Sequence, residues 1–108
     1  MELTETAIAE LKSKYADRDL EVFKAPNGAD LVIVSPDETT YTMFTNDVTN
    51  EKKDKAVSMK AYALRCTVFP DKTVVSQLFA RYPAFPGVIT MHLNKMAGGV
   101  EELDVKKL

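Results

Sequence analysis

Apolar residues recur at helical spacings of three and four positions near the start of the chain. The stripe consists of Leu3, Ala7, Ile8, Leu11 and Tyr15. This period predicts an amphipathic helix within residues 1–17, because such a helix turns one apolar face toward a core. Thr4 precedes the stripe and is placed to cap the helix through its hydroxyl oxygen.

The pattern then changes to two short runs rich in Val, Ile and Phe, at 19–25 and 30–35. Between them lies the dipeptide Asn27-Gly28. Asn and Gly tolerate the positive φ that tight turns require, and the flanking residue types favour strands. We therefore predict an antiparallel β-hairpin over residues 19–35.

Helical spacing returns over residues 36–99, where punctuating residues divide the chain into about four helices. We expect Ser35 to cap the first of these helices before Pro36, and a second helix to run from about Ala56 and end by Phe69, ahead of Pro70. Asp71 should cap the third helix, which stops at Tyr82-Pro83. The fourth should open at Pro86 and end at the Gly98-Gly99 pair. Segment 38–48 stays open between helix and strand. Its threonines favour a strand, whereas the preceding cap favours a helix.

The chain of 108 residues suits one domain spanning 1–108. The predicted class is α+β and mostly α-helical, with an N-terminal helix and β-hairpin followed by a bundle of about four helices. The tail 100–108 alternates charged residues with Val and Leu, and we expect it to be frayed.

Composition and charge argue against some classes of function. Apolar residues make up 45% and charged residues 28%, which is ordinary for a globular domain. The net charge is −2 with both signs interspersed, so nucleic acid is not an expected partner. No signal peptide or membrane-spanning run is visible, and we expect a soluble protein in the cytoplasm with no membrane partner.

Candidate chemistry is sparse. Cys66 is the only thiol and His92 the only imidazole, and they fall on different predicted helices. The simpler interpretation is a small buried hydrophobe for Cys66 and a partly buried helix-face residue for His92. A structural zinc site needs about four Cys or His ligands. The alternating acids Asp17, Asp19 and Glu21 lack the glycine and distal glutamate of a calcium loop. We expect no catalytic residue, metal or cofactor.

A succession of motifs in the second half of the chain does suggest a family. Residues 63–71 read Ala-Leu-Arg-Cys-Thr-Val-Phe-Pro-Asp, residues 81–86 read Arg-Tyr-Pro-Ala-Phe-Pro, and residues 95–99 read Lys-Met-Ala-Gly-Gly. In this order, and preceded by the strand pair, they resemble tail assembly chaperones of long-tailed bacteriophages. The resemblance covers about 20–99, and the N-terminal helix has no counterpart in it.

The resemblance implies a non-enzymatic protein of the infected or lysogenic bacterial cell. It would bind the tape measure protein, assist assembly of the tail tube protein, and be absent from the mature virion. Homo-oligomers are expected, and many such genes also yield a longer frameshifted product. The candidate partner-binding residues are Phe79, Tyr82, Phe85, Val88 and Met91. Three alternatives remain: a structural tail or virion component, another small interaction domain without catalysis, and a small enzyme using Cys66 and His92.

Overall fold

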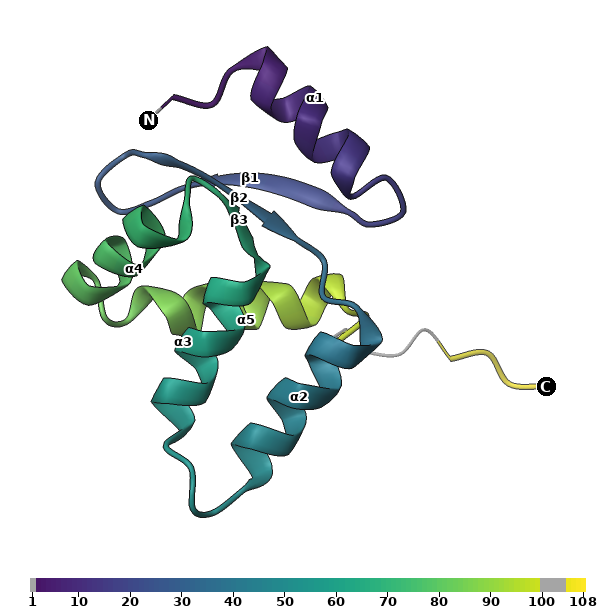
Figure 1. Ribbon diagram of the computed structural model, residues 1–108. Coiled ribbons are helices and arrows are strands. Elements are labelled where there is room, and N and C mark those ends of the chain that lie inside the picture. The colour runs from purple at the N-terminus through teal and green to yellow at the C-terminus, as the bar shows by residue number, and fades with distance from the viewer. Residues whose placement is uncertain (1, 100–104) are drawn as a thin grey trace.

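The computed structural model describes residues 2–99 and 105–108, and it shows an antiparallel sheet of three strands with helices on both sides (Figure 1). The elements in chain order are α1 (Glu5–Lys14), β1 (Leu20–Lys24), β2 (Asp30–Val34), α2 (Glu38–Thr49), α3 (Lys55–Cys66), β3 (Thr67–Phe69), α4 (Lys72–Arg81) and α5 (Phe85–Met96). In Figure 1, α1 lies above the sheet, whereas α3, α4 and α5 lie below it. The predicted α+β, mostly helical class is confirmed.

The hairpin forms where the Asn27-Gly28 turn predicted it. Strand β1 pairs with β2 over five consecutive positions, from Leu20 opposite Val34 to Lys24 opposite Asp30. Gly28 has a φ of +87°, which explains the need for glycine at this point of the turn. Both strands are slightly shorter than predicted.

Segment 38–48 is helical, but its cap differs from the predicted one. The carboxylate of Asp37, not the hydroxyl of Ser35, accepts the Thr40 N–H at 2.8 Å. Ser35 instead completes the hairpin, because its Oγ accepts the Asp19 N–H at 3.1 Å. Its carbonyl oxygen also accepts the Arg18 Nε–H at 2.9 Å. The predicted caps Thr4 and Asp71 are confirmed.

The third strand was not predicted, since the helix before it was expected to run on toward Phe69. Helix α3 ends at Cys66, and β3 pairs with β2 to complete the order β1-β2-β3. Thr67 donates its hydroxyl to the Ala63 carbonyl at 2.7 Å. The Lys72 ammonium donates to the carbonyls of Leu64 and Thr67. The Ala63 carbonyl also accepts the Thr67 N–H, so these bonds together hold the end of α3 at the point where the chain enters the sheet.

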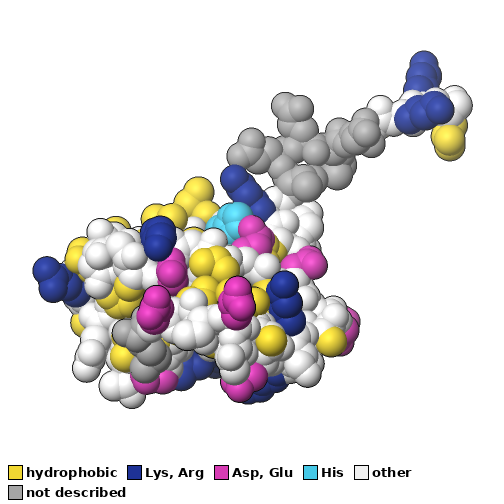
Figure 2. Space-filling view, turned by 90° about the horizontal axis from the view of Figure 1, so that it is seen from above, with side chains coloured by type: hydrophobic (Ala, Val, Ile, Leu, Met, Phe, Trp, Pro, Cys, Tyr) yellow, Lys and Arg dark blue, Asp and Glu magenta, His cyan; other side chains and the backbone are white. Residues whose placement is uncertain are grey.

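The last helix ends as predicted. Gly98 has a φ of +95°, and its N–H donates to the Lys95 carbonyl at 3.1 Å. Of the tail expected to fray, residues 100–104 lie outside the described residues. Residues 105–108 form no helix or strand and stand apart from the body of the protein in Figure 2.

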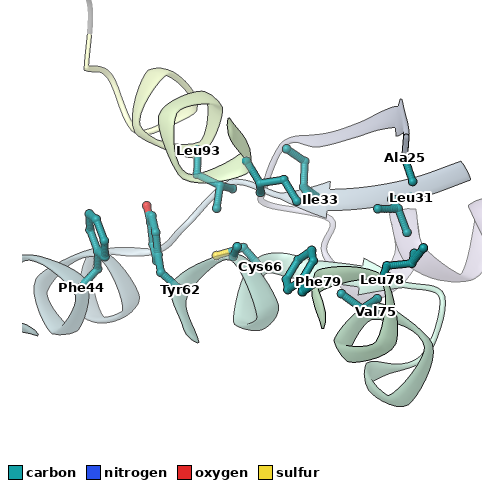
Figure 3. Close-up of a cluster of buried hydrophobic side chains, with 12 residues drawn as sticks. Ala25, Leu31, Ile33, Phe44, Tyr62, Cys66, Val75, Leu78, Phe79 and Leu93 are labelled. Atoms are coloured by element: carbon teal, nitrogen blue, oxygen red, sulfur yellow. The ribbon is translucent and has the colours of Figure 1, made fainter. Parts of the chain in front are cut away.

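One cluster of buried side chains connects the sheet with the helices below it (Figure 3). Its largest members, almost without solvent exposure, include Leu31, Ile33, Tyr62, Phe79 and Leu93. They come from β2, α3, α4 and α5, and in Figure 3 they point toward one another. No residue of α1 is buried to this degree, so α1 is a lighter cover on the other face of the sheet.

Candidate functional site

An apolar groove opens between β1 and α5, with a volume of about 280 Å³. We call it the β1–α5 groove, and it is lined by Glu21, Val22, Phe23, Ile33, Phe85, Val88, Ile89 and His92. Six of these eight residues are apolar. A hollow of this chemistry suits the apolar side chains of a ligand or another polypeptide.

Two sequence periods bring the groove residues together. Glu21 and Phe23 are two positions apart on β1, so they share the face of the sheet that meets α5. Phe85, Val88 and His92 are three and four positions apart on α5, which places them on one side of the helix. The rings of Phe23 and Phe85 meet with centroids 5.7 Å apart and planes tilted by 49°. This ring contact packs β1 against α5.

A polar contact also joins the two walls. His92 Nε2 lies 3.2 Å from Glu21 Oε1, and both side chains are about half exposed. When the imidazole is protonated this contact is an ion pair. Figure 2 shows the histidine beside an acidic side chain, with hydrophobic side chains next to them. The groove therefore has one charged boundary beside an apolar surface.

The apolar surface continues beyond the groove. Phe85 and Val88 also line a second hollow, which extends past the start of α5 to Pro26, Arg81 and Tyr82. The exposed fractions are 56% for Val22, 59% for Val88 and 68% for Met91. Together these residues form a contiguous open apolar surface along α5 and β1.

The structure separates the five predicted partner-binding residues into two groups. Val88 and Met91 are exposed on α5, and Tyr82 and Phe85 are partly buried beside them. Phe79 is different, because it is only 1% exposed and belongs to the core cluster. Its inclusion in a free surface is therefore corrected: the helical period identified an apolar position but not the elements that cover it.

That β1 contributes to this surface was not predicted from the sequence. Val22 and Phe23 were predicted strand residues, and nothing in the hairpin pattern pairs them with a helix more than sixty residues later. The available signal was the helical spacing of Phe85, Val88 and His92, which predicts one apolar side of α5 but not its neighbour.

Cys66 and His92 occupy different environments. Cys66 is 1% exposed within the core, and burial raises the pKa of its thiol to about 11. The thiol is therefore protonated at neutral pH, whereas nucleophilic attack requires the thiolate. His92 lies at the surface against Glu21. The buried-hydrophobe interpretation of Cys66 is confirmed.

The described part of the chain contains neither a cluster of metal-ligating side chains nor a helix suited to crossing a membrane. No group of three or more His, Cys, Asp or Glu side chains within residues 2–99 and 105–108 is arranged to hold a metal ion. Over the same residues, none of the helices combines the length and apolar character that crossing a bilayer requires.

Comparisons with known proteins concern the fold. No protein-family model matches the chain, and a search of curated protein sequences gives no match. A solved structure of an uncharacterised protein from Bacillus stearothermophilus, rbstp2171, is similar to it with a TM-score of 0.69. The match covers 92% of this chain and 99% of that chain at 20% sequence identity. The two proteins therefore share a fold over nearly their whole lengths.

Proposed function

We propose that this protein is a non-catalytic, polypeptide-binding assembly factor, and specifically a tail assembly chaperone of a long-tailed bacteriophage. In this role it binds apolar segments of the tape measure protein in the host cytoplasm and assists assembly of the tail tube. The observation that carries the proposal is the open apolar surface formed by the β1–α5 groove and Met91.

The chemistry of this surface suits an amphipathic helix. Helix-binding grooves accept apolar side chains at helical spacing and keep polar groups at the boundary. Phe85 and Val88 supply fixed apolar contacts, and the flexible thioether of Met91 adapts to different side chains. Glu21 and His92 supply a polar boundary. The order of motifs over 63–99 supports the assignment to tail assembly.

The experiment measures binding to a tape measure protein of a long-tailed bacteriophage, by co-expression and co-purification. Val88→Asp places a charge in the groove at a 59% exposed position, so binding should fall at least tenfold while the helical circular dichroism stays unchanged. The matched control is Val57→Asp, which alters a 65% exposed valine of α3 outside the groove and should leave binding intact.

Equal binding by Val88→Asp and the unaltered protein would contradict the proposed surface. Mass spectrometry of purified particles tests the assignment separately. A chaperone should be missing from finished virions, whereas a structural tail component would be present in them.

A further inference from the structure

Strand β1 has a neighbour on only one side among the described residues, because the sheet order is β1-β2-β3. Two backbone bonds show which residues face that neighbour. The Ala25 N–H donates to the Ala29 carbonyl, and the Asp19 carbonyl accepts from the Ser35 N–H, each at 2.8 Å. In an antiparallel ladder every second residue directs both its groups to the same neighbour, so odd-numbered positions face β2. The residues that direct their N–H and C=O groups to the open side are Leu20, Val22 and Lys24.

Two of the usual protections against edge pairing, a bulge and a proline, are absent from β1, whereas the charged residues Glu21 and Lys24 are present. The five pairs of β1 with β2 follow one another without a bulge, and β1 contains no proline. Helix α1 lies over the face of the sheet opposite α3, α4 and α5, where Ala7 and Leu11 line one hollow together with Val68 and Phe69. The side chain of Val22 is 56% exposed.

We infer that β1 pairs antiparallel with β1 of a second copy of this chain, about a two-fold axis at Val22. In this register Val22 lies opposite its own counterpart, and Leu20 lies opposite Lys24 in both directions. All three outward-facing residues of each strand then bond, which gives about six intermolecular hydrogen bonds. The result is a continuous six-stranded sheet.

The sequence of β1 favours this register over the two registers in which the axis is shifted by one residue. Glu21 lies opposite Phe23, so no like charges face each other directly. A shift of the axis to position 21 would place Glu21 opposite Glu21. A shift to position 23 would place Leu20 opposite Pro26, which has no N–H to donate. The strand is therefore self-complementary in one register.

The pairing has a consequence for binding, and this consequence alone rests on the proposed function. The axis is perpendicular to the sheet, so both copies present α5 and the β1–α5 groove on the same face. A long polypeptide with repeated apolar segments would then engage two grooves, which raises its apparent affinity through effective concentration.

Substitution at Val22 tests the hydrogen bonding. Val22→Pro removes one outward N–H and leaves the ladder with β2 intact, because that N–H does not face β2. Val22→Thr retains the N–H and a similar shape. Light scattering after gel filtration should give twice the 12.0 kDa chain mass for the unaltered protein and Val22→Thr, and 12.0 kDa for Val22→Pro. An unaltered protein that is monomeric at 100 µM would overturn the inference.

Cross-linking tests the register and remains decisive if Val22→Pro fails to fold. Val22→Cys should form an intermolecular disulfide, since directly opposite residues have Cα atoms about 5.5 Å apart. Lys24→Cys is the control, because four strand positions separate the two Lys24 residues by about 14 Å. Efficient cross-linking at Lys24 but not at Val22 would overturn the pairing. A cross-linked dimer that fails to bind the tape measure protein would count against the proposed function only.

Discussion

The region around Tyr62 and the region around Phe85 contain the same kinds of apolar residue, yet one is closed and the other is open. Tyr62 is fully buried, and its ring stacks on Phe44 with centroids 4.1 Å apart. Phe85 is only partly buried, and its neighbour Val88 is 59% exposed. The difference lies in the number of elements that cover each side chain, and it is invisible in the local sequence.

The position of each strand explains the contrast. Strand β2 lies between two strands and has helices on both faces, so four of its five residues are buried. Strand β1 lies at the edge of the sheet, and none of its five residues is buried. An apolar residue at an edge is therefore available to a partner, whereas the same residue in the centre stabilises the fold.

The largest expected effect on the free energy of unfolding comes from truncating a side chain in the buried core. Phe79→Ala removes a ring that is 1% exposed and leaves a cavity, so it should lower the free energy of unfolding by about 3–5 kcal/mol. Val57→Ala, at a 65% exposed position, should change it by less than about 0.5 kcal/mol. Urea denaturation followed by circular dichroism measures both. Similar losses for the two variants would mean that exposure does not distinguish core from surface here.

Much of the fold was predictable because its signals are local. The Asn27-Gly28 turn, the Thr4 and Asp71 caps and the Gly98 terminator each act through bonds within a few residues. Strand β3 was not predictable in the same way. Its three residues follow a helix directly, and they become a strand through pairing with β2 more than thirty positions earlier.

Prediction of the candidate binding surface from the sequence was limited for the same reason, because it too depends on tertiary contacts. The sequence prediction placed Val88 and Met91 among the partner-binding residues, and the structure leaves both exposed. The same prediction included Phe79, which lies on α4 and is buried in the core cluster. Periodicity reports which positions are apolar, but tertiary contacts decide which of them remain open.

A smaller effect, of opposite sign, is expected from Tyr62. Its hydroxyl is buried and has no hydrogen-bond partner among the described residues, and burial raises the pKa of this phenol. An unsatisfied buried hydroxyl is unfavourable, so Tyr62→Phe should raise the free energy of unfolding by about 1 kcal/mol. The control Tyr41→Phe alters a tyrosine that is 38% exposed and should have almost no effect. A loss of stability in Tyr62→Phe would show that the hydroxyl bonds a buried water molecule.

An effect of similar size, which depends on pH, concerns α2, whose only buried residue is Phe44 and which therefore depends on its cap. Hydrogen bonding by the Thr40 backbone N–H and, to a lesser degree, by the Thr40 side chain holds the pKa of the Asp37 carboxyl below its ordinary value, with a smaller contribution from Arg18. A depressed folded-state pKa contributes stability above the unfolded pKa of about 3.9, and this stability is lost as pH falls through the folded value. Asp37→Ala should therefore cost about 1 kcal/mol at pH 7, and the difference from the unaltered protein should shrink below pH 4. Asp37→Asn keeps a capping oxygen without the charge, so its stability relative to Asp37→Ala should be nearly independent of pH. A cost for Asp37→Ala that is equal at pH 7 and pH 3, measured by urea denaturation, would exclude the carboxylate as the source of the cap's strength.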